Sequence, residues 1–287
     1  MAMSPSLVCA APAKINLYLH ITDRRDDGYH RLDSLVAFAG VHDAITIAPA
    51  DHLELRIDGP CAGPLKGERD NLVLQAARGL AQIAGIEAKA AIGLTKRLPV
   101  ASGMGGGSAD AAAAIRGLCQ LWNLNPAADE VADLAFGLGA DVPVCLYGKA
   151  AFVGGIGEDI SPAPALPACS IVLVNDGNSL STPAVFTARS GAFSGPGRFN
   201  YAPADAAELA AILASRRNDL SAPAQRLNPA IQSVLAAIEA TDKVLLTRMT
   251  GSGATCFGLY GAPGQAAAAA LALGKAHPDW WIKAASL

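Results

Sequence analysis

The stretch Pro99–Ala114, PVASGMGGGSADAAAA, constrains this chain most, because four of the five residues from Gly103 to Gly107 are glycine. Glycine loses more conformational freedom on folding than any other residue, so such a cluster needs a physical reason. The alanine-rich run that follows it predicts a helix. A glycine loop that opens a helix presents several backbone N–H groups at the positive end of the helix dipole, and these bind anions. The stretch therefore predicts a phosphate-binding loop, with a hydroxyl available from Ser108.

The familiar phosphate-binding patterns do not fit this loop. A P-loop requires a lysine after its last glycine, and none follows here. A Rossmann fingerprint counted from Gly103 would need glycine where Ser108 stands, and the protein-kinase signatures are absent. A second glycine loop, Thr250–Gly258 (TGSGATCFG), lies between two predicted strands. Together, the two stretches predict two loops that face one ligand.

Composition and charge exclude several classes of function. The chain has 287 residues and a formal net charge of −3, without a block of like charges, so no nucleic-acid partner is expected. No apolar run approaches the ~20 residues that cross a bilayer, and the N-terminus lacks a signal pattern. The six cysteines have no metal-binding spacing and are predicted to be buried thiols in a reducing compartment. We therefore expect a cytoplasmic protein that acts on a small molecule, with no membrane association and no obligate protein partner.

Strands and helices follow one another out of strict βαβ order, which predicts an α+β fold. Residues 43–49 and 52–58 are predicted to form a hairpin, and the helix after Asp70 is predicted to end at Gly85. One helix is predicted from Pro126 to a glycine-marked exit, before the strand-like run VPV.

Two charged residues are candidates for phosphoryl-transfer chemistry. Asp141 lies at the glycine-flanked helix exit and is the best candidate for a base that accepts a hydroxyl proton. An isolated aspartate in a loop is more often a solvated residue. Lys14 lies on the polar face of the alternating strand KINLYLHI, where an exposed edge-strand lysine is the commoner case. A lysine beside Asp141 would hold the carboxylate ionised and offset charge on the transferred phosphoryl group.

Other polar and aromatic residues suggest a pocket. Asn16 and Tyr18 share the strand face of Lys14, and the pair Tyr29-His30 follows a turn and could stack on a ring. The histidines form no metal-binding pattern, so metal ligands are left unassigned.

Three segments together resemble the three motifs of the GHMP kinases, the group of galactokinase, homoserine kinase, mevalonate kinase and phosphomevalonate kinase: APAKINLYL, PVASGMGGGSADAAA and MTGSGATCFGLY. More closely, AKINLYLHITDRRDDGYHRLDSLV, GLGADVPV and STPAVF resemble the branch that phosphorylates the 2-hydroxyl of 4-diphosphocytidyl-2-C-methyl-D-erythritol in non-mevalonate isoprenoid synthesis. The resemblance implies a two-domain α+β GHMP kinase fold with an ATP and substrate cleft between the domains. It implies ATP and Mg²⁺ as cofactors. The expected domains are 1–157, joined by a returning C-terminal strand at 279–287, and 158–278.

The resemblance also implies roles for individual residues. Asp141 matches the catalytic base and Lys14 its partner. The family's adenine pocket is bordered by residues that match Asn71, Leu72 and Lys96. The cytosine ring is held by residues that match Tyr29, His30 and Phe186, and substrate contacts match Asn16 and Thr182. The ATP-binding loop comprises Pro99, Val100, Ala101, Ser102, Gly103, Met104, Gly105, Gly106, Gly107, Ser108 and Ala109.

The chain departs from the family pattern in two places. Ser108, Ala109 and Asp110 stand where family members often have Ser-Ser-Asn, which leaves open any phosphate or magnesium contact of the second serine. Asp110 could favour the helix N-terminus electrostatically. The loop GAFSGPGRFN has no counterpart that we can place. No dedicated acidic magnesium ligand is evident, so nucleotide phosphates and water are expected to hold the metal.

Two alternatives stay open. One is another GHMP kinase, whose small acceptor carries no nucleotide; the segment DGYH and Phe186 argue against it. The other is a non-catalytic nucleotide-binding sensor. The presence of both Lys14 and Asp141 argues against a sensor, which needs no base.

Overall fold

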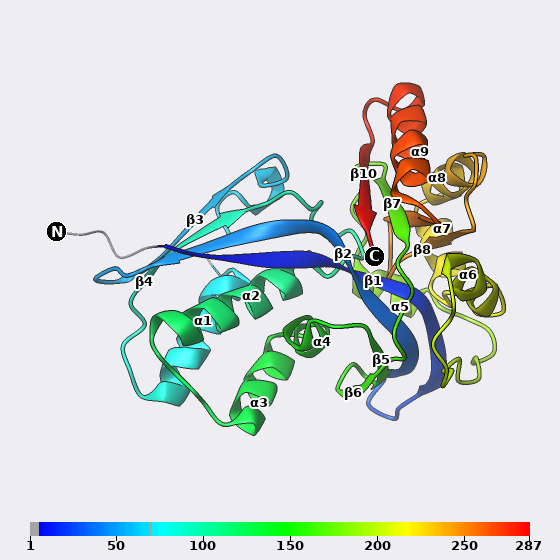
Figure 1. The fold of residues 1–287 in the computed structure, drawn as a ribbon. Coiled ribbons are helices and arrows are strands. Elements are labelled where there is room, and N and C mark those ends of the chain that lie inside the picture. The colour runs from blue at the N-terminus through cyan, green and yellow to red at the C-terminus, as the bar shows by residue number, and fades with distance from the viewer. Residues whose placement is uncertain (1–5, 69) are drawn as a thin grey trace. The chain divides into compact units, whose positions relative to one another are not determined.

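The computed structural model describes residues 6–68 and 70–287 and divides the chain into two compact units. Unit 1 comprises the described residues up to Ala13, His42–Val100 and Gly106–Gly148. Unit 2 comprises Lys14–Val41, Ala101–Gly105 and Lys149–Leu287. Two long strands, β1 (Leu7–Arg24) and β2 (His30–Ala48), contribute residues to both units (Figure 1). Each unit combines helices with strands, which confirms the predicted α+β class.

The strand pairing in unit 1 differs from the predicted hairpin. The end of β2 pairs antiparallel with β4 (Ala90–Thr95), and β3 (Leu53–Asp58) runs parallel to β4 on its other edge. The hairpin prediction is therefore wrong, because β4 lies between the two segments that were expected to pair. Alternation identifies each strand locally, but its partner is decided by non-local pairing.

One helix of unit 1 begins and ends at recognisable capping residues. The Asn71 side chain caps α1 (Leu72–Ala84), and Gly85 ends this helix at φ 64°, as predicted. The single helix predicted after Pro126 is instead two helices, so the run VPV is helical and not a strand. Pro143 lies in the first turn of the second of these, where its missing N–H has no intrahelical role. The remaining elements of unit 1 are η1 (Gly63–Leu65), α2 (Gly106–Leu121), α3 (Ala128–Leu138) and α4 (Val142–Tyr147).

Unit 2 contains two sets of paired strands. The first part of β2 pairs antiparallel with β5 (Ala151–Gly155), which forms a hairpin with β6 (Asp159–Pro162). A separate four-stranded sheet has the order β10–β7–β9–β8. Its antiparallel β8 and β9, joined by the second glycine loop, confirm the strand–loop–strand prediction. The strands of this sheet are β7 (Ser170–Asn175), β8 (Leu246–Met249), β9 (Cys256–Tyr260) and β10 (Trp281–Ser286).

The last strand belongs to the four-stranded sheet of unit 2. β10 pairs antiparallel with β7, with Trp281 opposite Asn175, so it is an edge strand of the four-stranded sheet. The division into domains 1–157 with 279–287 and 158–278 stays a prediction. Its end lies beside β2, because a Cβ on Gly40 would stand 2.8 Å from the Ser286 hydroxyl oxygen. The expected boundary at residues 157 and 158 falls in the turn between the paired strands β5 and β6.

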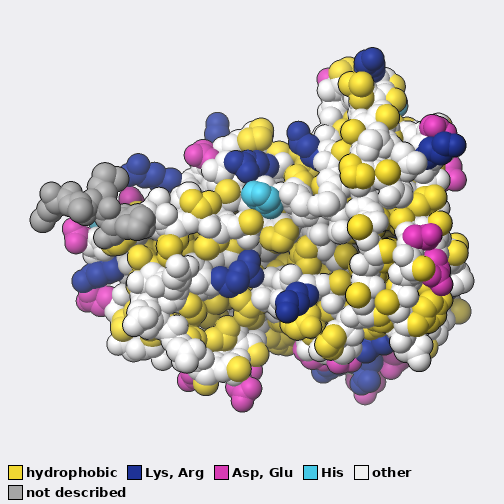
Figure 2. Space-filling view, viewed as in Figure 1, with side chains coloured by type: hydrophobic (Ala, Val, Ile, Leu, Met, Phe, Trp, Pro, Cys, Tyr) yellow, Lys and Arg dark blue, Asp and Glu magenta, His cyan; other side chains and the backbone are white. Residues whose placement is uncertain are grey.

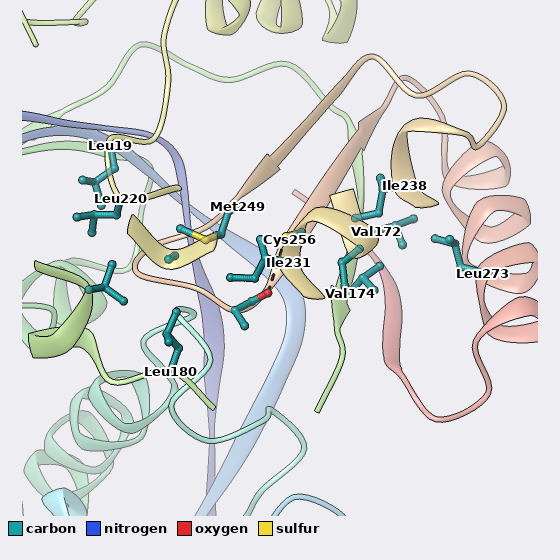
Figure 3. Packing of buried hydrophobic residues seen from close by; sticks show 14 of the residues in the cluster. Leu19, Val172, Val174, Leu180, Leu220, Ile231, Ile238, Met249, Cys256 and Leu273 are labelled. Atoms are coloured by element: carbon teal, nitrogen blue, oxygen red, sulfur yellow. Dashed lines mark hydrogen bonds between the residues drawn. The ribbon is translucent and has the colours of Figure 1, made fainter. Parts of the chain in front are cut away.

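The core of unit 2 lies between the four-stranded sheet and its helices (Figure 3). Val172 and Val174 of β7 pack with Ile231 and Ile238 of α8, and Leu273 of α9 joins the same cluster. Neither α6 nor α7 was predicted, and α6 lies in alanine-rich sequence with weak apolar periodicity. The helices are α5 (Thr182–Thr187), α6 (Ala206–Ala214), α7 (Ser221–Leu227), α8 (Ala230–Glu239) and α9 (Pro263–Ala276).

The face drawn in Figure 2 shows no single dominant charge. On the face drawn in Figure 2, Lys and Arg side chains occur as separate groups and not as one continuous patch. Within residues 6–68 and 70–287, no helix has both the length and the apolar character needed to cross a membrane.

Candidate active site

The two glycine loops are in direct contact within unit 2. A Cβ on Gly103, where φ is 79°, would lie 2.6 Å from the Thr250 carbonyl oxygen, and a Cβ on Gly251 would lie 2.4 Å from the Gly103 oxygen. The Thr255 N–H also donates to the Ser102 carbonyl oxygen at 3.1 Å. No side chain larger than a hydrogen fits at these two glycines. Part of the glycine cluster is therefore explained by the backbone of the second loop, whereas the prediction that both loops face one ligand stays a prediction.

Later glycines of the first loop make room for charged and apolar side chains. A Cβ on Gly105 would lie 3.3 Å from Lys14 Cε in unit 2. In unit 1, a Cβ on Gly106 would lie 3.3 Å from Lys96 Nζ, and one on Gly107 would lie 3.5 Å from a Leu72 methyl group. The first turn of α2 is thus packed against two of the residues predicted to border adenine.

Lys96 lies in a buried ion cluster, which consists of Lys96, Asp43 and Asp110. Its ammonium group donates to Asp43 at 2.5 Å and to Asp110 at 2.7 Å, and no more than 3% of any of the three side chains is exposed. The other oxygen of Asp43 accepts from the N–H groups of Arg97 and Leu98. Asp43 thereby fixes the chain that leads into the first glycine loop, and Asp110 ties the same lysine to α2.

The buried ion cluster also changes proton affinities. The pKa of Asp110 is raised to about 7: burial is the main cause, Lys96 opposes the rise, and nearby Asp43 adds to it. Burial lowers the pKa of Lys96, but the two carboxylates outweigh it and the net shift is upward. Asp110 is therefore more than a residue that favours the helix N-terminus, because it is an ion-pair partner of Lys96.

Asn71 uses its side chain to cap α1. Its Oδ1 accepts from the Val73 N–H at 3.0 Å, and its Nδ2 donates to Glu68 at 2.7 Å. The side chains of Asn71 and Lys96 are thus engaged within the protein, while Leu72 is half-buried. A ligand at this place would meet apolar atoms and backbone groups first.

The predicted catalytic pair is divided between the two units. Lys14 lies on β1 in unit 2, is 3% exposed, and its N–H donates to the Met104 carbonyl oxygen at 2.9 Å. Asp141 lies in unit 1 at the N-cap position of α4, and its carbonyl oxygen accepts from the Cys145 N–H. The pairing of these two side chains stays a prediction.

The predicted acceptor-binding residues all lie in unit 2. The rings of His30 and Phe186 are 5.4 Å apart and tilted by 31°, so these two are brought together, whereas Tyr29 is 62% exposed. Burial lowers the pKa of His30, and two nearby arginines lower it further. Thr182 shares a 2.7 Å hydrogen bond with Ser252 of the second glycine loop, and the Asn16 N–H donates to the Thr250 hydroxyl at 2.9 Å.

Residues 191–200 are anchored on β1 and β2. Asp33 accepts hydrogen bonds from the Tyr18 hydroxyl at 2.9 Å, the Gly197 N–H at 2.6 Å and the Arg198 Nε at 2.8 Å. His20 contacts the Gly195 carbonyl oxygen at 2.8 Å. The polar face of β1 is therefore shared: Tyr18 and His20 lie under this loop, while Lys14 and Asn16 lie beside the glycine loops.

Several polar residues around the polar face of β1 escaped sequence reasoning, among them Asp33, Ser34 and Arg198. Ser34 and Asp33 lie on β2 and contact the polar face of β1. The alternating polar residues of β1 were a signal for such partners, because a buried polar strand face needs polar groups to hydrogen-bond with. Which residues supply those partners is visible only in the pairing of β1 with β2.

Comparison with known proteins agrees with this geometry. The family model for the GHMP kinase N-terminal domain matches residues 71–149, and that for the GHMP kinase C-terminal domain matches residues 203–279. A 4-diphosphocytidyl-2-C-methyl-D-erythritol kinase of Paramagnetospirillum magneticum is 54% identical over 96% of this chain and 97% of its own length. One of the same name from Rhodospirillum rubrum is 49% identical over 97% of this chain and 92% of its own length.

Solved structures show the same relationship. A crystal structure of 4-(cytidine 5'-diphospho)-2C-methyl-D-erythritol kinase is 34% identical, with a TM-score of 0.78 and 98% of both chains covered. Homoserine kinase from Cytophaga hutchinsonii shares the fold, with a TM-score of 0.73 at 18% identity. The match covers 99% of this chain and 96% of that one. With nearly full-length matches at these identities, the chain belongs to the GHMP kinase family and, within it, to the 4-diphosphocytidyl-2-C-methyl-D-erythritol kinases.

Proposed function

We propose that this kinase transfers the γ-phosphoryl group of ATP to the 2-hydroxyl of 4-diphosphocytidyl-2-C-methyl-D-erythritol, a step of isoprenoid precursor synthesis. The observation that carries the proposal is the gathering of the predicted acceptor-binding residues in unit 2. There, Asn16 and Thr182 hydrogen-bond to the second glycine loop, which packs on the first. We also propose a cytoplasmic location, in keeping with six free cysteines and a reducing compartment.

The cytosine ring is proposed to bind at His30 and Phe186. Their adjacent rings and the exposed ring of Tyr29 offer flat apolar surfaces on which a pyrimidine can stack. Because the pKa of His30 is lowered, its imidazole is neutral at pH 7. A neutral imidazole has one donor and one acceptor nitrogen, which suits the mixed hydrogen-bonding edge of cytosine.

The nucleotide phosphates are proposed to bind where the first glycine loop leads into α2. Backbone N–H groups and the helix dipole favour anions there, and Ser108 adds a hydroxyl. Leu72 and the backbone near Lys96 are proposed to contact adenine, because the Asn71 and Lys96 side chains are engaged within the protein.

Mg²⁺ is proposed to bind mainly through the nucleotide. Mg²⁺ usually keeps several waters and binds through substrate phosphates and few carboxylates, so nucleotide phosphates and water are proposed to hold it. When bound, it neutralises charge on the phosphates.

Asp141 is proposed to act as the base and Lys14 as its partner. The acceptor oxygen forms a bond to the γ-phosphorus, the bond to the ADP oxygen breaks, and the hydroxyl proton passes to the Asp141 carboxylate. The Lys14 ammonium keeps that carboxylate ionised and stabilises negative charge on the transferred group.

The deciding experiment measures ADP release from ATP with Mg²⁺. The acceptors are 4-diphosphocytidyl-2-C-methyl-D-erythritol and, in parallel, homoserine, galactose and mevalonate. Turnover confined to the cytidylated acceptor is the expected result. Turnover with another acceptor would keep the kinase chemistry but refute the proposed substrate. ATP binding without turnover of any acceptor would favour the nucleotide-binding sensor.

A further inference from the structure

The amide of Asn16 is buried but only half satisfied. The side chain lies on β1 and the residue is 4% exposed. Its Nδ2 donates to the Ser34 hydroxyl at 2.8 Å, whereas its Oδ1 has no hydrogen-bond partner among the described residues. A buried amide oxygen without a partner is costly, so this atom needs a ligand or a water molecule to accept from.

The orientation of this amide follows from counting the protons of Ser34. The Ser34 hydroxyl, on β2, lies 2.5 Å from the Tyr18 carbonyl oxygen, and it must be the donor because a carbonyl has no proton. The single proton of the Ser34 hydroxyl is therefore donated to Tyr18, and toward Asn16 the hydroxyl oxygen can only accept. A flipped amide would place two acceptor oxygens 2.8 Å apart. Ser34 thus holds the Asn16 NH₂ group toward itself and turns Oδ1 away.

The Oδ1 atom belongs to a residue that adjoins both glycine loops. The Asn16 N–H donates to the Thr250 hydroxyl, and the Thr250 carbonyl oxygen lies against Gly103. Lys14, two residues earlier on the same strand face, donates its N–H to Met104 of the first loop. All of these residues lie in unit 2.

An oxygen fixed as an acceptor selects its ligand. It binds a hydroxyl, which has a proton to donate, and disfavours a phosphate oxygen, which has none and carries charge. We propose that Ser34 is a positioning residue that presents Asn16 Oδ1 to a hydroxyl of the polyol part of the acceptor. This inference rests on the proposed function and adds an atom and an orientation to the contact predicted for Asn16.

The test separates the polyol from the nucleotide part of the acceptor. Calorimetric titrations of the full chain use 4-diphosphocytidyl-2-C-methyl-D-erythritol and, separately, CDP, which lacks the polyol. In Ser34→Ala the amide loses its orienting acceptor, so affinity for the complete acceptor should fall about 10-fold, as for one lost hydrogen bond. Affinity for CDP should stay within about twofold. Ser34→Cys has the same shape with a slightly larger atom, and its sulfur accepts hydrogen bonds weakly. It should show the same two affinities as Ser34→Ala and replaces that variant if Ser34→Ala does not fold.

The matched control is Ser170→Ala, a buried serine on β7 of the same unit. It should leave both affinities unchanged. Equal losses for CDP and the complete acceptor would show a general structural effect and overturn the inference, as would no loss for either. If the unmodified chain binds CDP but shows no tighter binding or turnover of the complete acceptor, the proposed function itself fails.

Discussion

The buried ion cluster makes a sharp stability prediction for Lys96→Met. The substitution removes the ammonium group that donates to Asp43 at 2.5 Å and to Asp110 at 2.7 Å, while it keeps much of the side-chain length. Because the three side chains are at most 3% exposed, water cannot replace the lost partner. Removing one partner of a buried ion pair costs about 3–5 kcal/mol, and here two carboxylates are left facing each other. We expect the free energy of unfolding to fall by about that amount.

The free energy of unfolding lost in Lys96→Met should increase with pH. Burial already raises the pKa of Asp110 to about 7, and without Lys96 this pKa should rise further. A carboxyl whose pKa is raised in the folded state destabilises that state as pH increases, because the unfolded chain releases its proton more readily. The difference between Lys96→Met and the unmodified chain should therefore be larger at pH 8 than at pH 5.5.

Urea unfolding followed by far-ultraviolet circular dichroism measures both effects. The control is Lys89→Met, since Lys89 pairs with Glu87 at 2.6 Å but the two side chains are 51% and 79% exposed. Exposed pairs contribute little, so this variant should unfold at an unchanged urea concentration. The reasoning would be refuted if Lys96→Met and Lys89→Met had the same free energy of unfolding. It would also be refuted if the free energy lost in Lys96→Met did not increase from pH 5.5 to pH 8.

The remaining predictions concern the site. Asp141→Asn should retain ATP binding but lose most turnover; near-normal turnover in the ADP-release assay would remove Asp141 as the base. Phe186→Ala should raise KM for the cytidylated acceptor more than it lowers kcat, and an unchanged KM would exclude it from the cytosine site. Because burial and two arginines lower the pKa of His30, its ring stays neutral above pH 7. CDP affinity should therefore be constant from pH 7 to 8.5 and fall only below its ordinary pKa of about 6.5, and calorimetry would contradict this if affinity already fell between pH 8 and 7. Gly103→Ala should lower the unfolding temperature, since its Cβ would lie 2.6 Å from a backbone oxygen; an unchanged temperature would argue against the close approach of the loops.

Local patterns in the sequence were enough to identify most elements. The helix that ends at Gly85 and the strands around the second glycine loop lie where they were predicted. These features depend on neighbours within a few residues, through capping, side-chain periodicity and the conformations open to glycine. The two glycine loops also carried the family resemblance, because their residues are contiguous in the chain.

Only the tertiary structure decided which elements and side chains meet. Both β3 and β10 were expected to be strands, but only the structure shows that β3 pairs with β4 and β10 with β7. The reason is that strand pairing depends on which other segments bury the same surface, and local sequence does not contain that information. The partners of Asp110 and Asn16 were hidden for the same reason. Lys96, from another part of unit 1, pairs with Asp110 and alters the pKa of that carboxyl. Ser34, from the neighbouring strand β2, orients the amide of Asn16. Both contacts exist only in the folded chain.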